Sequence, residues 1–385
     1  MEASTNRSEH TIFIGMDVHK ESFTLCCYSA EKDKFFGLQK IAPDSELIVQ
    51  YLQSAKSFYD THARVVCGYE AGCLGYSLYR ELAAAGVECV ILAPSTMPVE
   101  AGKKRVKTDK RDAKRIAQCL AFHTYKPVHV PTEESEEIKD FIRMRNDHKQ
   151  ALKRIKQQIN AFCLRHSFHY PSGRHKWTLA HLDWLKKLKL NDMQREILNE
   201  YLLTLNYLIE RIALLDKRIE ALSQKPEFKD RVSKLRCFIG IKTITAMTAL
   251  AEIGDFNRFA DAEHFASYLG LTPGEDSSGD KQHRLGITKA GNVHVRRLLV
   301  EAAHCYNRGQ VGYKSKDLKA RQAGCPPEVI AYADRANVRL RKRYFRFLKN
   351  NKNPNVSCVA IARELACFIW GMMVNKYDRN PQIVS

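Results

Sequence analysis

The apolar runs in the first hundred residues come in an order that few folds can accommodate. Three strand-like runs lie close together, at residues 11–16, 23–29 and 34–41. The gaps between them are too short for a crossover helix. These runs are therefore expected to pair as an antiparallel meander.

Helix and strand patterns alternate after this meander. The predicted elements are a helix at 46–55, a strand at 63–67, a helix at 76–85, a strand at 88–92 and a helix through 113–120. Asp44 and Ser45 are suitable caps for the first of these helices. Three strands followed by helix, strand, helix, strand and helix is the order of an RNase H-like fold. We therefore expect an α/β domain of this type over residues 1–130.

Four acidic residues occupy corresponding places in these elements. Asp17 in GMDVHK and Glu70 in CGYEAG each follow a buried strand run. Asp109 and Asp112 in KTDKRDAKR lie three residues apart where a helix begins, so both side chains share one helix face. In an RNase H-like architecture the first strand, the fourth strand and a late helix carry the acids. The four residues are therefore expected to converge.

This set of acids fits a metal site. Mg²⁺ takes oxygen ligands and is rarely enclosed fully by protein, so phosphoryl-transfer enzymes gather a few carboxylates and let the phosphate complete the shell. Three or four carboxylates can hold two ions. For any single acid, solvation or an ion pair with a basic neighbour is the simpler interpretation. Asp17 is the least ordinary, because an acid closing an apolar strand loses hydration unless it is paired or metal-bound.

The charge balance indicates a polyanionic partner. Lys and Arg number 62 against 43 Asp and Glu, a formal net charge of +19, and phosphate backbones are the obvious counter-charge. One basic cluster surrounds the acid pair and consists of Lys103, Lys104, Arg105, Lys107, Lys110, Arg111, Lys114 and Arg115. A second, for which we also expect phosphate binding, consists of Arg335, Arg339, Arg341, Lys342, Arg343 and Arg346.

Long amphipathic helices are predicted over residues 131–225. The first begins near Glu136, and its apolar register is interrupted at Arg145 and His148. A turn at 170–176 follows. The second helix has a four-heptad seam made of Leu198, Tyr201, Leu205, Leu208, Ile212, Leu215, Ile219 and Leu222. This pattern predicts a coiled-coil domain, and both an intramolecular hairpin and a dimerising stalk fit it.

A third domain is predicted over residues 226–385. Its segment 235–254 resembles a helix-hairpin-helix, in which Gly240 and Ile241 form the turn and Lys242 stands where a second Gly is common. Such an element touches DNA phosphates without reading sequence. An ordinary helical corner fits the segment equally well.

A polar, Gly-rich loop is predicted next, over residues 273–286. Its Ser277 and Ser278 are candidate nucleophiles. The cations nearby, which could neutralise a phosphate, are Lys281, His283, Arg284, Lys289, Arg296 and Arg297. From composition alone a solvated linker is the simpler interpretation.

The cysteine spacing and the lack of long apolar stretches indicate where in the cell the protein is expected. The twelve Cys show no CxxC spacing, so neither a zinc ribbon nor a disulfide framework is expected. The first ten residues are polar, and no apolar stretch of about 18 residues is evident. We therefore expect a protein of the bacterial cytosol, associated with the nucleoid and without a membrane segment.

Taken in order, the motifs resemble the DEDD-type insertion-sequence transposases, bridge-RNA-guided recombinases to which Piv-type DNA invertases are also similar. The matching motifs are GMDVHK, YEAG, KTDKRDAKRIA, GIKTITAMTALAEIGDFNRF, ASYLGLTP, the SSG loop and GITKAGNVHVRRLLVEAA. The segment VAIARELACFIWGM additionally resembles the branch with an extended C-terminus. The resemblance covers nearly the whole chain.

This resemblance implies a RuvC-like domain, a coiled-coil insertion and a C-terminal transposase domain that supplies a nucleophilic serine. By motif, the catalytic and metal-binding acids are Asp17, Glu70, Asp109 and Asp112, and the nucleophile is Ser278, with Ser277 as the one-residue alternative. The implied cofactor is Mg²⁺, two ions per site, with Mn²⁺ as a substitute. The implied partners are donor and target DNA, a structured noncoding guide RNA, and further copies of the chain that assemble as dimers into a tetramer.

Other activities fit parts of the pattern. A structure-specific nuclease or junction resolvase would use the same acids with water as nucleophile, and the serine would be dispensable. A non-catalytic nucleic-acid scaffold would use the acids only as partners for adjacent Lys and Arg. A tyrosine recombinase is the weakest alternative, because His294, Arg296 and Arg297 have no tyrosine in an evident partner motif. P-loop, GxSxG and HExxH motifs are absent, which removes support for ATPase, hydrolase and zinc-protease readings.

Overall fold

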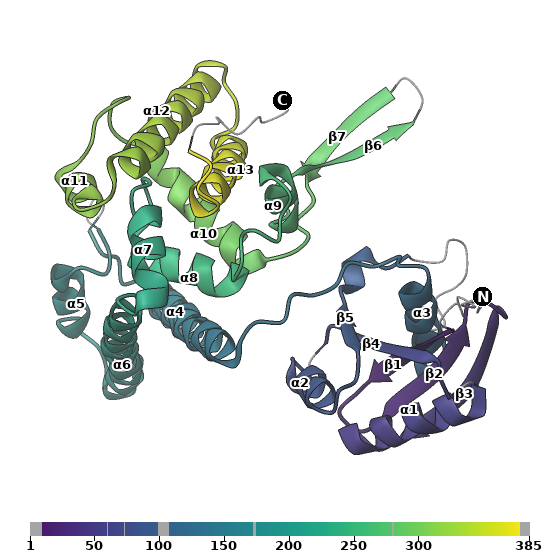
Figure 1. The fold of residues 1–385 in the computed structure, drawn as a ribbon. Coiled ribbons are helices and arrows are strands. Elements are labelled where there is room, and N and C mark those ends of the chain that lie inside the picture. Colours follow the sequence, from purple (N-terminus) through teal and green to yellow (C-terminus); the bar gives the residue numbers. More distant parts are fainter. Residues whose placement is uncertain are drawn as a thin grey trace. The chain divides into compact units, whose positions relative to one another are not determined.

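The chain divides into two compact units, each described here by itself. A computed structural model describes residues 10–59, 61–72, 74–98, 108–171, 175–278 and 281–377, and for 275–278 and 281–284 it describes the backbone only. The N-terminal unit is Met1–Val130 and the C-terminal unit is Pro131–Ser385 (Figure 1).

A five-stranded mixed sheet forms the N-terminal unit. Its strands are β1 (Thr11–Val18), β2 (Phe23–Ser29), β3 (Lys34–Ile41), β4 (Arg64–Glu70) and β5 (Cys89–Leu92). The strand order is β3-β2-β1-β4-β5. β1 pairs antiparallel with β2 and parallel with β4, which in turn pairs parallel with β5. The predicted meander is therefore confirmed, and β1 lies at the centre of the sheet.

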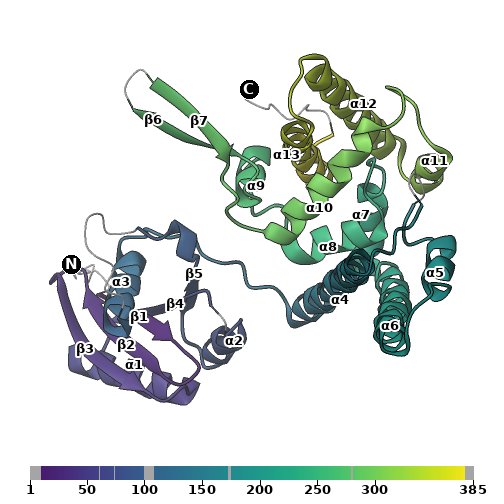
Figure 2. The same cartoon turned by 180° about the vertical axis from the view of Figure 1, so that it is seen from behind.

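Helices cover both faces of this sheet. α1 (Ser45–Tyr59) and α2 (Ser77–Ala84) pack on one face and α3 (Asp109–Ala121) on the other, which Figure 2 shows from behind. A short 3₁₀ helix, η1 (Pro94–Thr96), follows β5. Residues of β1 alternate between the two faces, as the pleat of a strand requires. Ile14 and its even-numbered neighbours join the α1 and α2 side, whereas Phe13 joins the α3 side.

The backbone of α3 lies directly on β1 at Gly15. A Cβ built on Gly15 would stand 2.0 Å from the Ala113 carbonyl oxygen and 2.4 Å from the Ala117 nitrogen. No side chain can be accommodated at such distances without moving the helix. The absence of a side chain at Gly15 therefore sets the separation of α3 from the sheet.

The C-terminal unit begins with a pair of long helices. α4 (Glu133–Arg165) and α6 (Asp192–Leu222) pack against each other, and α5 (Leu179–Lys186) lies between them in sequence. All predicted seam residues of α6 except Tyr201 are buried. The helical hairpin is thus formed within one chain. α5 was not predicted, because its eight residues are too few to establish a helical period.

A partly buried ion pair explains the interruption of the α4 register at Arg145. Arg145, with 9% of its side chain exposed, donates to both carboxylate oxygens of Asp216 on α6 at 2.6 and 3.0 Å. Apolar clusters lie on either side of this pair along the two helices. One includes Ile155 and Leu205, and the other includes Ile142 and Ile219. A polar residue at this seam position is therefore satisfied by its partner helix.

The rest of the C-terminal unit is mostly helical. Its elements are α7 (Pro226–Leu235), α8 (Thr243–Ile253), α9 (Ala262–Tyr268), β6 (Pro273–Ser278), β7 (Lys281–Ile287), α10 (Val293–Ala303), η2 (His304–Asn307), α11 (Lys316–Gln322), α12 (Pro327–Lys349) and α13 (Pro354–Met373). These helices, apart from α11, share one apolar core with the first turns of α4 and the last turns of α6.

Among the described residues, α13 alone is long and apolar enough to cross a membrane by length and composition, although 72% of its most apolar window is buried within the unit. It packs against α9, α10 and α12, and its burial in this core accounts for its apolar composition.

The turn between α7 and α8 is held from two sides. Gly240 has a φ of 81°, and a Cβ there would stand 2.5 Å from the Ala302 carbonyl oxygen of α10. Arg321 of α11 donates to three main-chain carbonyls of the turn, those of Arg236, Phe238 and Ile241. The corner is therefore rigidly placed, with Lys242 exposed at the start of α8.

The segment expected to be a loop is a β-hairpin. β6 and β7 pair antiparallel, and the last pair described is Ser278 with Lys281. The prediction of a loop over 273–286 was wrong because Gly, Ser and Asp are also common in short hairpins. In Figure 1 the hairpin extends beyond the helices of its own unit.

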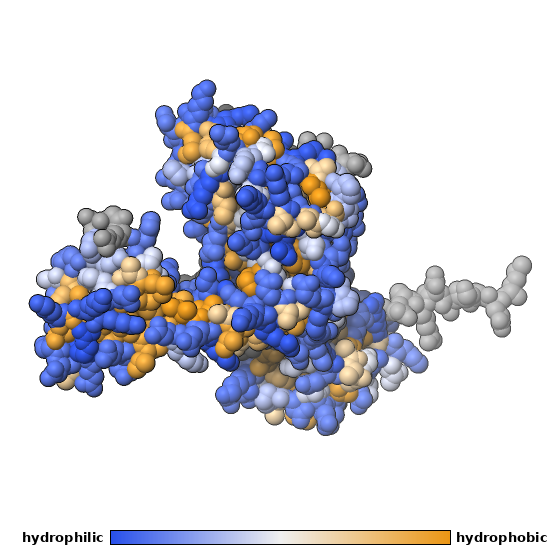
Figure 3. All heavy atoms as spheres, turned by 90° about the vertical axis from the view of Figure 1, so that its left-hand side faces the viewer, coloured by the Kyte–Doolittle hydropathy of each residue, from blue (hydrophilic) through white to orange (hydrophobic). Residues whose placement is uncertain are grey.

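The surface of the molecule reflects its composition. Hydrophilic residues cover most of the face in Figure 3, as expected from the excess of Lys and Arg. The cysteines within the described ranges are all free thiols.

Candidate metal-binding site

The sheet directs two of the predicted acids to the same face. Asp17 belongs to the residues of β1 that face α3, two positions after Gly15. Glu70 ends β4 and shares the α3 face with Gly68, where a Cβ would meet Leu120 of α3. Because β1 and β4 are parallel and Met16 pairs with Tyr69, Asp17 and Glu70 come one position later on adjacent strands.

The first turn of α3 supplies the other two acids. Thr108 caps the helix, its hydroxyl accepting from the Arg111 main-chain N–H. Asp109 and Asp112 follow in that turn, where a helix N-terminus favours negative charge. The close packing at Gly15 brings this turn beside β1.

Three potential ligands gather around Asp17. Carboxylate oxygens of Asp17 and Asp109 and a ring nitrogen of His19 all lie within 4.8 Å of one another. His19 Nε2 lies 3.2 Å from Asp17 Oδ2. The Asp17 side chain is 13% exposed and that of His19 is 50% exposed, so the group opens to solvent on the histidine side.

Basic side chains partner the other acids. Arg115, one turn into α3, places Nη2 at 3.1 Å from Glu70 and 3.4 Å from Asp112. Lys40 of β3 lies 3.6 Å from Asp109. The pairing with basic neighbours that the sequence allowed therefore occurs, and it links Glu70 and Asp112 into one network.

The site nevertheless has the character of a cation site. Burial raises the pKa of the Asp17 carboxyl above its ordinary value; His19 opposes this rise, and the negative charges of Asp112 and Asp109 add to it. Asp112 Oδ2 is buried and has no hydrogen-bond partner. A buried carboxylate oxygen without a donor is costly, and a divalent cation would satisfy it. The residues present therefore fit a divalent metal ion.

His19 and Arg115 were not predicted as members of this site. His19 stands two residues after Asp17 in GMDVHK, and alternation along an extended strand was the available signal, because residues 17 and 19 share a face. Arg115 follows Asp112 by three residues, which is helical ion-pair spacing. The sequence grouped it only with the surrounding basic cluster.

We expect Arg115→Ala to make the protein more responsive to metal. Removing the guanidinium leaves Glu70 and Asp112 without their shared counter-charge, so the metal-free melting temperature should fall. Addition of Mg²⁺ or Mn²⁺ should then raise it by several degrees more than in the wild type. Thermal melts with and without metal test this, with Arg115→Lys as the charge-retaining control. A higher metal-free melting temperature in Arg115→Ala would contradict the expectation.

The predicted nucleophile lies in the other unit. Ser278 ends β6, and Ser277 pairs with Gln282 across the hairpin. The backbone thus places both serines at the far end of the hairpin. Lys281 and Arg284 lie on β7, in the part of the hairpin for which only the backbone is described.

The basic residues predicted to bind nucleic acid differ in their exposure and in their contacts within the chain. Lys103, Lys104, Arg105 and Lys107 lie outside the described residues. Lys110, Lys242 and Lys289 are exposed, as is Arg111, which lies at the start of α3. Arg297 is half-buried and lies 3.9 Å from Glu301. Arg296 donates to the carbonyls of Leu269 and Ala290, so it also holds the connection into α10.

Several arginines of the second basic cluster, on α12, make contacts within the C-terminal unit. Arg339 and Arg343 on α12 both pair with Glu364 of α13, whose side chain is 1% exposed. Arg341 is buried and donates to the carbonyls of Gln310 and Tyr313. These three arginines make contacts inside the unit, and phosphate binding by the run stays a prediction.

Two family models match this chain. One, described as a transposase, covers residues 14–168, which include the four acids. The other, described as Transposase IS116/IS110/IS902 family, covers residues 232–317, which include Ser278. The transposase for insertion sequence element IS1533 of Leptospira borgpetersenii is 30% identical over 336 residues, covering 86% of this chain and 95% of that relative. The chain belongs to the IS116/IS110/IS902 family of transposases.

Further relatives agree with this membership. The Sinorhizobium fredii protein y4qE is 36% identical over 304 residues, covering 79% of this chain and 74% of the relative. The transposase for insertion sequence element IS1111A of Coxiella burnetii is 23% identical over 369 residues, covering 94% of this chain and 90% of that relative. The chain is thus an insertion-sequence transposase, an enzyme that binds, cleaves and rejoins DNA.

Proposed function

We propose that this transposase is a recombinase guided by a noncoding bridge RNA, which exchanges strands between donor and target DNA through a covalent phosphoserine. The observation that carries the proposal is the cluster of Asp17, Glu70, Asp109 and Asp112, which the fold gathers on one face of the sheet. The segment that supplies Ser278 accompanies this cluster in the same chain.

We propose three domains, one of which carries the acids and another the serine. Residues 1–130 form a RuvC-like, RNase H-like domain, which the strand order β3-β2-β1-β4-β5 supports. Residues 131–225 form a coiled-coil domain, supported by the separate apolar cluster shared by α4, α5 and α6. Residues 226–385 form the transposase domain, in which the α7–α8 corner acts as a helix-hairpin-helix on DNA phosphates.

In the proposed reaction the serine conserves the energy of the DNA linkage. The Ser278 hydroxyl attacks a DNA phosphate, a P–O bond to the DNA breaks, and the displaced DNA hydroxyl takes up the proton. A hydroxyl of the other DNA strand then attacks the phosphoserine and releases the serine, so no ATP is needed. Water in place of serine would leave the strands cut.

The acids and their neighbours hold this chemistry in place. Asp17, Glu70, Asp109 and Asp112 would hold two Mg²⁺ ions, or Mn²⁺ in their place, and these ions would activate the serine and stabilise charge on the phosphate. Arg115 keeps Glu70 and Asp112 oriented, and the exposed Lys110 is available to the DNA backbone. Sequence choice would come from base pairing with the RNA, while the protein contacts mainly backbone.

The active form we propose is a tetramer built from dimers in the bacterial cytosol, at the nucleoid. In this tetramer the RuvC-like domain of one copy meets the transposase domain of another. Such an arrangement brings acids and serine together although they belong to different units of the chain.

One experiment separates this proposal from its alternatives. The purified protein is incubated with Mg²⁺, the flanking noncoding RNA of its element, and labelled donor and target DNA, and a denaturing gel is probed for protein-linked DNA. An adduct that requires both RNA and metal supports the proposal. Free cut ends without an adduct would instead indicate a water-using nuclease or junction resolvase, and intact DNA that is bound equally well without metal would indicate a scaffold.

A further inference from the structure

The C-terminal half of α4 and the segment after it lack acidic residues entirely. Between Asp147 and Asp183 the sequence contains four Lys and three Arg but no Asp or Glu. A chain with 43 acidic residues has few stretches of this length without one. This stretch is therefore strongly cationic, and it lies in no site described so far.

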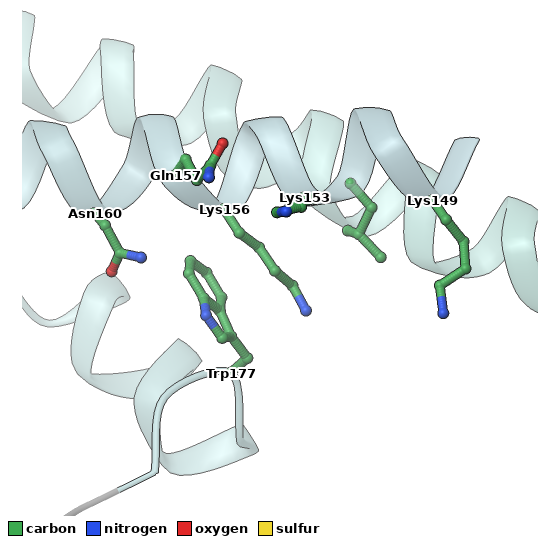
Figure 4. Close-up of a pocket in the computed structure, with 7 residues that line it drawn as sticks. Lys149, Lys153, Lys156, Gln157, Asn160 and Trp177 are labelled. Atoms are coloured by element: carbon green, nitrogen blue, oxygen red, sulfur yellow. The ribbon is translucent and has the colours of Figure 1, made fainter. Parts of the chain in front are cut away.

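Its lysines share one side of α4. Lys149, Lys153 and Lys156 are spaced by four and three residues, which places them in one row along the helix, and Asn160 continues the row. The row of lysines spans about 10 Å at the rise of an α-helix. Figure 4 shows these side chains on the side of α4 that faces Trp177.

A tryptophan closes the other side of this row. Trp177 has a φ of 67°, a conformation that is uncommon for a bulky residue. Its main-chain N–H donates to His181 of α5, which fixes the turn and presents the half-buried indole toward α4. Lys156 Nζ lies 5.2 Å from the centre of the ring. Strained residues of this kind are often found at binding sites.

Helix and indole together enclose a hollow. Its volume is about 330 Å³, and it is lined by Lys149, Leu152, Lys153, Lys156, Gln157, Asn160 and Trp177. This volume lies at the lower end of the range of small-ligand pockets. The hollow can therefore receive a single nucleobase and its sugar, but not a duplex.

The three lysines around the hollow, Lys149, Lys153 and Lys156, form no ion pair with any residue that the structure describes. Burial lowers the pKa of Lys156, and the charge of Lys149 lowers it further. An anion placed between these lysines would relieve both effects.

We propose that this hollow binds a single-stranded segment of nucleic acid, with one base stacked on Trp177 and the adjoining phosphates on Lys149, Lys153 and Lys156. A flat aromatic face beside a row of cations is the combination that unpaired nucleotides require. Asn160, whose Oδ1 accepts from Lys176 Nζ at 3.1 Å, keeps its amide N–H groups for the edge of the base. This inference rests on the proposed function for the presence of unpaired strands, which a guide RNA and opened target DNA both provide.

Binding of short probes to the full-length protein tests the proposal. The probes are twelve-nucleotide oligo(dT) and oligo(U), an abasic strand of the same length, a duplex, and an oligoglutamate peptide, all measured in EDTA so that no cleavage is involved. Oligo(dT) or oligo(U) should bind at least about fivefold more tightly than the abasic strand and should quench tryptophan fluorescence. The tighter of the two identifies the natural strand as DNA or RNA.

Matched variants locate the binding. Trp177→Ala should weaken binding of the preferred oligonucleotide about tenfold, and Trp177→Phe should retain most of it. Lys153→Glu should weaken all nucleic-acid probes and reduce the salt dependence, whereas Lys217→Glu, an exposed lysine on α6, should change neither.

Two outcomes would overturn the proposal. One is equal binding of the oligonucleotide by the wild type and by both Trp177→Ala and Lys153→Glu. The other is equal binding of the abasic strand or the peptide, which would make the hollow a general anion site. Ser278→Ala should bind the probes normally, so failure of the phosphoserine mechanism would not be mistaken for failure of this site.

Discussion

Replacing Ser278 by alanine should abolish the protein-linked DNA and reduce strand exchange by at least about a thousandfold, because removal of a nucleophile costs most of the chemical rate. Water cannot substitute, since hydrolysis would not conserve the bond needed for rejoining. The measurement is the fraction of labelled DNA that migrates with denatured protein, alongside the yield of recombined product.

Ser277→Ala is the matched control for this variant. Ser277 and Ser278 are adjacent on β6. Because the proposed intermediate forms on one hydroxyl, that of Ser278, Ser277→Ala should retain the adduct. An adduct lost in Ser277→Ala but kept in Ser278→Ala would move the nucleophile by one residue. Recombination that survives both substitutions would exclude the serine mechanism.

Asp17→Asn should abolish activity and at the same time stabilise the metal-free protein. Burial and the neighbouring Asp112 and Asp109 raise the pKa of Asp17, so its charged form is unfavourable in the folded state. The amide has the same shape without the charge. Its melting temperature without metal should therefore exceed that of the wild type, by about 2–4 °C for each kcal/mol of relief.

The pH dependence of this effect has a definite sign. Because folding raises the pKa of Asp17, the folded protein binds its proton more readily than the unfolded chain. The destabilisation due to Asp17 is therefore complete above the raised pKa and disappears as the pH falls below the ordinary value for Asp. The stability difference between Asp17→Asn and the wild type should accordingly shrink on acidification. A protonated Asp17 carboxyl is a poorer metal ligand, so the stabilisation that metal gives the wild type should shrink as well.

Thermal melts over a pH series, with EDTA or with Mg²⁺, measure both effects. Glu21→Gln, at an exposed position in the same turn, makes the same change of net charge and serves as the control. A metal-free Asp17→Asn protein that melts below the wild type would mean that the Asp17 carboxylate is needed for its bond to His19 more than it is opposed by its acidic neighbours.

The sequence was most informative where a repeating pattern reports packing directly. The heptads of α6 predicted its buried face, because a residue every three or four positions must lie on one side of a helix. The three closely spaced strands likewise allowed only antiparallel pairing. α5 and the β6–β7 hairpin were missed, because eight helical residues and a Gly- and Ser-rich strand contain too little periodic signal.

The acids were predictable because each lies near one end of a recognisable strand or helix, but their partners were not. Lys40 reaches Asp109 from the far end of β3, and no local spacing relates these two residues. The same limit applied to the basic run on α12. Its charge was visible in the sequence, but the contact of Arg339 and Arg343 with Glu364 depends on how α13 folds back.

Gly15 has a consequence for how this transposase can lose activity. It has no side chain and belongs to no reacting group, yet it alone lets the helix bearing Asp109 and Asp112 rest on the strand bearing Asp17. A single added methyl group there would part the acids without altering any of them. Inactive copies of the element in a genome should therefore include lesions at this glycine that leave every acid and the serine intact.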